Sequence, residues 1–312
     1  MDMAKVGLLY DEGFLKHETG SHPENRARVE HTYDYLRSRP VFASLTELAP
    51  RPATRDEVTL IHTEGYYDSL LGIPKDRSVA LDPDTIFSPG SFDAALSAAG
   101  AVVTAMEAIA RGDLERAFCL VRPPGHHARA GLAMGFCIFN NVAIGAAVGL
   151  ERLGFGRVAI VDIDVHHGNG TQEIFYDSAE VLYCSIHQSP FYPGTGSRQE
   201  TGSGPGAGKT VNVPLPAGTT EDEYLAAMDE VIVPAVLDHR PEIILVSAGF
   251  DAHRQDPIGG MDLTTDSFRS ITERIVEAAK QSCGGRVVSV LEGGYDLTAL
   301  AASIEAHLEA LL

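Results

Sequence analysis

The sequence predicts a three-layer α/β/α fold built on a mainly parallel sheet of about eight strands. Two patterns indicate it: short apolar segments alternate with longer amphipathic segments, and the apolar segments are almost continuously hydrophobic. Strands covered by helices on both faces have this continuous pattern, whereas half-exposed strands alternate. The strand candidates are residues 5–10, 116–121, 157–164, 181–187, 242–248 and 286–292.

Helical segments separate these strand candidates. Residues 91–111 are rich in alanine, follow Pro89 and Gly90, and stop before Gly112, which are typical start and stop signals of a helix. Similar patterns occur at residues 141–153, 221–238, 265–281 and 297–312. Because no repeat, linker or long charge block interrupts the alternation, we expect residues 1–312 to form a single domain.

The composition indicates a globular protein with an acidic surface. The chain has 24 Lys and Arg against 43 Asp and Glu, a formal net charge of −19, and 44% of its residues are hydrophobic. An acidic surface repels nucleic-acid phosphates, so no direct nucleic-acid binding is expected. It suits cationic partners such as lysine side chains or polyamines, although the same charge could simply provide solubility.

Cysteine usage and the N-terminus predict a cytoplasmic protein. The cysteines contain no C-x-x-C pair, which is typical of reduced thiols, and they are Cys119, Cys137, Cys184 and Cys283. The first residues lack a signal-peptide pattern. No run was found to approach the roughly 18 apolar residues of a membrane span, so no membrane association is expected.

Polar residues and glycines directly follow five of the strand candidates. These segments are RPPGHHA, DIDVHHGNGTQ, IHQSPFYPGTG, GFDAH and EGGYD, beginning at residues 122, 162, 186, 249 and 292. The carboxyl ends of parallel strands meet along one edge of a sheet, where open α/β folds bind their ligands. The sequence therefore predicts a functional site at this edge.

A metal site is predicted around the segment DIDVH. In an extended chain, Asp162, Asp164 and His166 point to the same side, and burying them together is costly without a cation. Asp251 follows another apolar segment and would face the same crevice, or could instead cap a turn. Two aspartates and one histidine leave an open coordination position, as catalytic sites do, and would suit Zn²⁺, Fe²⁺ or Mn²⁺.

Two other segments offer catalytic groups. His126 and His127 follow the rigid segment Arg122-Pro-Pro-Gly and could supply a general base and a general acid near neutral pH. Tyr295, which follows Gly293 and Gly294, could donate a hydrogen bond to a developing oxyanion. In isolation, the histidines could be surface residues and the tyrosine a packed turn residue.

The segment GSGPGAGKT at residues 202–210 resembles a phosphate-binding loop only superficially. Ser203 occupies the place of the first glycine, and the following VNVPLP cannot begin a helix. We interpret it as a flexible loop.

With these motifs in place, the sequence resembles the histone deacetylase superfamily, in particular its class II-like bacterial members and the related acetylpolyamine amidohydrolases. The resemblance covers nearly the whole chain and implies the arginase/deacetylase fold. Its motifs, in order, are HETGSHPENRARVE, LDPDTIFSPGSFDAA, RPPGHHA, GFCIFNN, VDIDVHHGNGTQ, YPGTG, SAGFDAH and LEGGYDL.

The resemblance implies roles for the matching residues. The implied zinc ligands are Asp164, His166 and Asp251. His127 would be the main general base and acid and His126 its electrostatic partner, so the implied catalytic set is His126, His127, Tyr295, Asp162 and Asn169. Asp162 would orient His126, and the neutral Asn169 should lower the pKa of His127.

Substrate and potassium sites are also implied by the resemblance. Phe136 and Tyr192 would form the walls of a tunnel for an acyl-lysine stem and Asp84 a carboxylate at its rim, in a substrate-binding set of Phe136, Tyr192, Gly135, Asp84 and Gly293. A structural K⁺ ion would lie at Asp162, Asp164, His166, Ser185 and Ile186.

The expected activity is hydrolysis of an acyl amide, most simply acetyl, on a lysine side chain of a protein or peptide. One alternative is a deacetylase of acetylpolyamines or other small acyl amides. Others are an arginase-like hydrolase with two metal ions and a non-catalytic metal-binding homologue. The sequence has no obvious insertion that would close a dimer over the site, which favours an open site, and it leaves the oligomeric state open.

Overall fold

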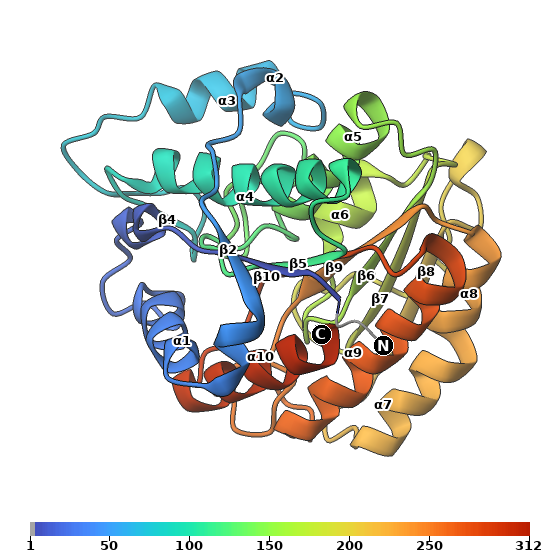
Figure 1. The fold of residues 1–312 in the computed structure, drawn as a ribbon. Helices are drawn as coiled ribbons and strands as arrows, with labels where there is room; N and C mark the ends of the chain where they lie inside the picture. Colours follow the sequence, from blue (N-terminus) through green and yellow to red (C-terminus); the bar gives the residue numbers. More distant parts are fainter. Residues whose placement is uncertain (1–3) are drawn as a thin grey trace.

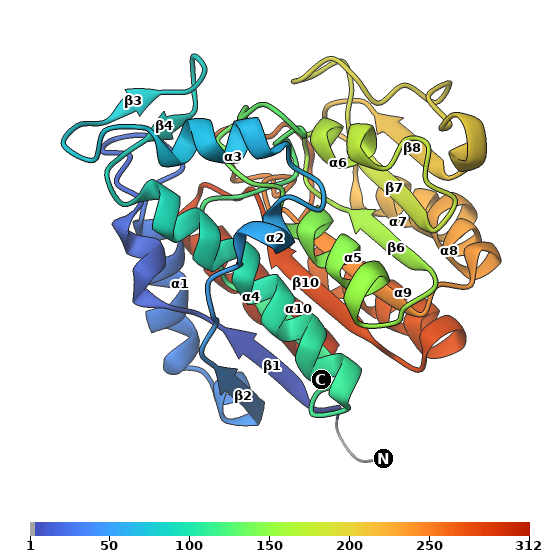
Figure 2. The same cartoon turned by 90° about the horizontal axis from the view of Figure 1, so that it is seen from above.

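An eight-stranded, entirely parallel sheet forms the centre of the computed structural model, which describes residues 4–312 (Figures 1 and 2). The strand order is β2-β1-β5-β10-β9-β6-β7-β8. The strands are β1 (Val6–Leu9), β2 (Leu45–Leu48), β5 (Arg116–Cys119), β6 (Val158–Asp162), β7 (Val181–Gln188), β8 (Thr210–Leu215), β9 (Ile243–Ala248) and β10 (Val287–Leu291).

Helices cover both faces of this sheet, which confirms the predicted three-layer architecture. Figure 1 shows α2 (Arg55–Val58), α3 (Glu64–Leu71), α4 (Ser91–Arg111), α5 (Asn141–Arg152) and α6 (Asn169–Ile174) on one side. The other side carries α1 (Ala27–Arg37), α7 (Glu221–Ala227), α8 (Val233–His239), α9 (Thr265–Cys283) and α10 (Leu297–Leu311). A small antiparallel pair, β3 (Val79–Ala80) and β4 (Ile86–Phe87), lies apart from the main sheet.

Helix α4 illustrates how the sequence specifies a core element. It ends at Gly112, whose φ of 79° is a left-handed conformation that glycine adopts without strain. By length and composition α4 would be long and apolar enough to cross a membrane, contrary to our expectation that no such run exists. However, 72% of its apolar window is buried inside the protein, which is typical of a core helix.

The structure corrects several predicted boundaries. The expected helix at 221–238 is divided into α7, a π-helical turn at Met228–Ile232, and α8. Pro234 lacks a backbone N–H and cannot make the regular helical hydrogen bond, which accounts for the wider turn before it. The strand predicted at 157–164 ends at Asp162. The extended conformation that was expected to point Asp162, Asp164 and His166 to the same side therefore does not continue to His166. Strands β2 and β8 were not predicted.

The topology brings the polar segments together. Strands β5, β10, β9, β6 and β7 are consecutive in the sheet and parallel, so the segments that follow them leave from the same edge. The segment at 202–209 forms a loop with a short 3₁₀ turn and leads into β8, so no helix follows it.

Candidate active site

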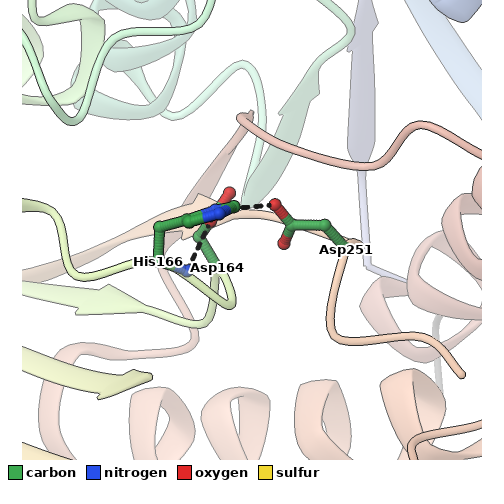
Figure 3. A group of neighbouring side chains, drawn as sticks. All are labelled: Asp164, His166 and Asp251. Atoms are coloured by element: carbon green, nitrogen blue, oxygen red, sulfur yellow. Dashed lines mark hydrogen bonds and ion pairs between the residues drawn. The ribbon is translucent and has the colours of Figure 1, made fainter. Parts of the chain in front are cut away.

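The three predicted metal ligands, Asp164, His166 and Asp251, meet at the carboxyl edge of the sheet (Figure 3). Asp164 and His166 follow β6, and Asp251 follows the neighbouring strand β9. One ligand atom of each residue lies within 4.8 Å of the other two. His166 Nδ1 is 3.0 Å from Asp164 Oδ1 and 3.2 Å from Asp251 Oδ2. The donors are therefore one imidazole nitrogen and two carboxylate oxygens.

The electrostatics of this cluster favour a bound cation. All three residues are buried. Burial, together with the charge of Asp164, raises the pKa of Asp251 to about 7. Burial would lower the pKa of His166, but hydrogen bonds and charges from both aspartates raise it to about 10. A divalent cation would compensate both carboxylates, and the donor set fits one.

Backbone contacts shape the cluster for such an ion. Gly293 N donates to Asp164 Oδ2 at 2.8 Å, and Val165 N donates to Asp251 Oδ1 at 2.9 Å. A Cβ atom on Gly293 would lie 2.0 Å from Asp251 Oδ2 and 2.6 Å from Asp164 Oδ2. Only glycine fits there, because any side chain would enter the space between the two carboxylates.

The histidine pair comes from the loop after β5. The rings of His126 and His127 are 4.1 Å apart, and both residues are buried. His126 Nδ1 lies 3.0 Å from Asp162 Oδ2, whereas His127 Nδ1 lies 2.8 Å from Asn169 Oδ1. Because an amide oxygen only accepts, His127 carries its proton on Nδ1 and has a lone pair on Nε2.

The different partners separate the pKa values of the two histidines. Burial would lower the pKa of His126, but the charges of Asp162, Asp164 and Glu292 raise it to about 10. Burial, and then the neighbouring charges of His126 and His166, hold the pKa of His127 well below its usual range. The pKa of His127 is lowered, as expected, but not by the expected cause: the hydrogen bond with Asn169 raises this pKa, and burial and the neighbouring histidines lower it. At neutral pH, one ring is charged and the other is neutral.

Tyr295 is placed by the loop after β10. Its ring lies 5.9 Å from that of Phe136, edge to face, and 4.8 Å from the guanidinium carbon of Arg28. Burial raises the pKa of Tyr295 well above its ordinary value, so the hydroxyl stays protonated and can donate a hydrogen bond.

A pocket of about 240 Å³ joins these groups. His126, His127, His166 and Tyr295 line it, and so do the five residues predicted for substrate binding, which are Asp84, Gly135, Phe136, Tyr192 and Gly293. The pocket also contains residues that were not predicted, Pro124, Cys137, Phe191 and Ile258. A larger hollow of about 720 Å³, beside α5 and α6, contains none of these candidate catalytic residues.

Several supporting residues were missed by the sequence reasoning. Glu292 Oε2 accepts hydrogen bonds from Gly125 N and His126 N, at 2.6 and 3.1 Å, which fixes the histidine loop to the end of β10. Its position directly after an apolar strand was a usable signal. Arg28 donates to the carbonyl oxygens of Glu292 and Gly294 from helix α1, a contact that no local pattern predicts.

Two of the residues predicted for potassium are direct neighbours. Asp162 on β6 and Ser185 on β7 are paired in the sheet, and both are buried. Ser185 Oγ is 2.8 Å from His187 Nδ1, and Asp162 Oδ1 accepts from Asp164 N at 3.2 Å. The potassium site itself stays a prediction.

Comparisons with known proteins agree with this geometry. A family model described as a histone deacetylase domain matches residues 22–311. A probable deacetylase of Archaeoglobus fulgidus is 44% identical over 295 residues, which cover 94% of this chain and 82% of that protein. Histone deacetylase 10, chloroplastic, of Oryza sativa subsp. japonica is 39% identical over 318 residues, covering 96% of this chain and 71% of the relative.

The crystal structure of the HDA15 HD domain is similar to the whole fold, with a TM-score of 0.94 and 36% identity over 99% of this chain and 90% of that one. Together these similarities define the class of protein as a hydrolase that acts on amide bonds. The chain belongs to the histone deacetylase superfamily, and its activity is that of a deacetylase.

Proposed function

We propose that this deacetylase is zinc-dependent and removes acetyl groups from lysine side chains of proteins or peptides. One observation supports the proposal most directly: a metal ligand, both histidines and Tyr295 line a single pocket of about 240 Å³. Phe136 and Tyr192 line the same pocket. Their aromatic rings suit the apolar stem of a lysine better than the charged, strongly hydrated chain of a polyamine.

Asp164, His166 and Asp251 would hold the metal ion. A bound zinc ion supplies a water of lowered pKa and polarises the acyl carbonyl. Fe²⁺ suits the same donors, so the metal used in cells is part of the proposal to be tested.

The remaining steps belong to the chain's own residues. Neutral His127 offers its Nε2 lone pair and takes a proton from the attacking water, while His126 stays charged beside Asp162. The protonated Tyr295 hydroxyl donates a hydrogen bond to the acyl oxygen as negative charge develops there. A protonated imidazole of the pair then gives its proton to the departing amine.

Replacing Tyr295 with phenylalanine is expected to lower kcat by about 10²- to 10³-fold, because one hydrogen bond to the developing oxyanion is lost. KM should change much less, since the aromatic ring remains beside Phe136. Steady-state kinetics on an acetyl-lysine peptide measure both quantities. A Tyr295→Phe enzyme with wild-type kcat would remove Tyr295 from the mechanism.

Replacing Asn169 with aspartate is expected to move the acid limb of the kcat/KM profile to higher pH. A carboxylate in hydrogen-bond contact with His127 Nδ1 favours the imidazolium, which raises the pKa of His127. Protonated His127 cannot accept a proton, so activity is lost at a higher pH than in the wild type. Gln199→Glu makes the same charge change at an exposed position and should leave the profile unchanged.

A substrate panel tests the proposed specificity. We would compare acetyl-lysine peptides, longer acyl-lysine peptides, acetylputrescine and acetylspermidine, each with zinc-loaded and iron(II)-loaded protein. The highest kcat/KM is expected for acetyl-lysine peptides. A clear preference for acetylpolyamines, which the net charge of −19 would also suit, overturns the lysine assignment.

The two-metal alternative has less support. The structure, over residues 4–312, contains one cluster of three metal-ligating side chains, whereas an arginase-like reaction needs a second ion. A metal analysis that gives two catalytic ions per chain would favour it.

We also propose a K⁺ ion at Asp162, Asp164, His166, Ser185 and Ile186. The cytoplasmic location stays a prediction.

A further inference from the structure

The side chain of Asp256 connects two loops that border the pocket. Its Oδ2 accepts hydrogen bonds from Tyr295 N at 2.6 Å and Asp296 N at 3.4 Å. Its Oδ1 accepts from Ile258 N at 2.9 Å and Gly259 N at 3.3 Å, within its own loop. Both Ile258 and Tyr295 line the pocket. One carboxylate therefore holds a residue of the pocket wall and the proposed oxyanion donor in a fixed relation.

The contact with Asp256 holds Tyr295 itself, whereas the glycines before it have other partners: Gly293 N donates to Asp164, and the carbonyl oxygen of Gly294 accepts from Arg28. Tyr295 follows these two glycines beyond the end of β10, and Gly294 has a φ of 121°, which side chains rarely allow. The ring packs against Phe136 and lies beside the guanidinium of Arg28. The 2.6 Å hydrogen bond to Asp256 fixes the backbone N–H of Tyr295.

Turn formation alone does not explain this arrangement. An aspartate that only stabilises its turn would bond to amides two and three residues ahead, as Oδ1 does with Ile258 and Gly259. Oδ2 instead reaches across 39 residues of sequence to Tyr295. Burial raises the pKa of Asp256, and the hydrogen bonds from these backbone amides oppose that shift by favouring its charged form.

We infer that Asp256 is a positioning residue that acts through Tyr295, and that its carboxylate sets where the tyrosine hydroxyl meets the acyl oxygen. This inference rests on the role proposed above for Tyr295. A displacement of a catalytic group by about 1 Å can cost roughly 100-fold in rate, so loss of this contact is expected to lower kcat by about 10- to 100-fold.

Two substitutions separate the contact of Asp256 with Tyr295 from its contacts within its own turn. Asp256→Asn has a single acceptor oxygen and cannot serve both loops, because its NH₂ group would face backbone N–H donors. Asp256→Ser can retain the turn through its hydroxyl but is too short to reach Tyr295. Both should lower kcat while metal content and Tm stay close to wild type. Asp262→Asn, at an exposed position, is the matched control.

A double-mutant cycle tests whether Asp256 acts through Tyr295. If it does, Asp256→Asn combined with Tyr295→Phe should have the kcat of Tyr295→Phe alone, within about twofold. Hydrogen–deuterium exchange gives an independent readout, in which the peptide containing Tyr295 should exchange faster in both Asp256 variants.

The outcomes distinguish a failure of the positioning role of Asp256 from a failure of the proposed role of Tyr295. If Tyr295→Phe is slow but Asp256→Asn and Asp256→Ser keep wild-type kcat, or if the losses multiply in the double variant, the positioning role is overturned. If both Asp256 variants lose Tm or metal, and exchange at residues 292–296 is unchanged, Asp256 is a stability residue and the inference is wrong. If Tyr295→Phe itself has wild-type kcat, the proposed mechanism fails instead.

Discussion

Replacing Asp251 with alanine is expected to abolish metal binding and deacetylase activity while the fold remains. Asp251 provides one of two carboxylates in the buried cluster, with Oδ2 3.2 Å from His166 Nδ1. The variant retains one imidazole and one carboxylate, fewer than the three protein ligands typical of catalytic zinc sites. Elemental analysis should show metal falling from about one catalytic ion per chain towards zero, and turnover should fall to the detection limit.

Thermal unfolding provides a second measurement for the same variant. Ligands that bind only the folded state raise its stability, so added zinc should raise the Tm of metal-free wild-type protein but not that of Asp251→Ala. In the metal-free protein, the pKa of Asp251 is raised to about 7. Its charged form therefore opposes folding at neutral pH, and its removal should cost little stability before metal is added.

Asp262→Ala is the control, because Asp262 is exposed and outside the cluster. It should keep wild-type metal content, turnover and response to zinc. An Asp251→Ala protein that still binds one catalytic ion and turns over normally would contradict the proposed ligand set.

Most of the central sheet was predictable because its strands have a clear local sequence pattern. Six of its eight strands are runs of apolar residues, and in the structure they are buried throughout. The two that were missed, β2 and β8, lie at the sheet edges and have mixed burial. An edge strand pairs on one side only and needs fewer apolar residues, so its sequence carries a weaker signal.

The position of the site was predictable for a topological reason. Parallel strands end at one edge, so the segments after β5, β6, β9 and β10 were expected to leave from the same edge. They meet because these four strands are neighbours in the sheet, an order that the local sequence patterns do not give. The residues that hold those segments were harder to find. Arg28 reaches the carbonyl oxygen of Gly294 across 266 residues, and Asp256 reaches Tyr295 across 39. Such contacts depend on tertiary packing, which no local spacing encodes.

Replacing His127 with alanine is expected to lower kcat by about 10²- to 10⁴-fold, because a general base is lost. Metal content should be unchanged, because none of the proposed metal ligands is replaced. The hydrogen-bond partner of His127 is Asn169, not a residue of the Asp164–His166–Asp251 cluster. The wild-type acid limb should lie below the ordinary imidazole pKa, since the pKa of His127 is lowered, and it should disappear in the variant.

Added imidazole can enter the space left by the side chain and should restore part of the activity of His127→Ala, which would not happen if the ring only packed the pocket. His31→Ala, at an exposed position, should retain wild-type kcat and pH profile. A His127→Ala enzyme with normal kcat would assign the base to another group, and His126, held charged by Asp162, is poorly suited to that role. In the proposed mechanism, the separation of the two pKa values is the reason for assigning His127, and not its neighbour, as the proton acceptor.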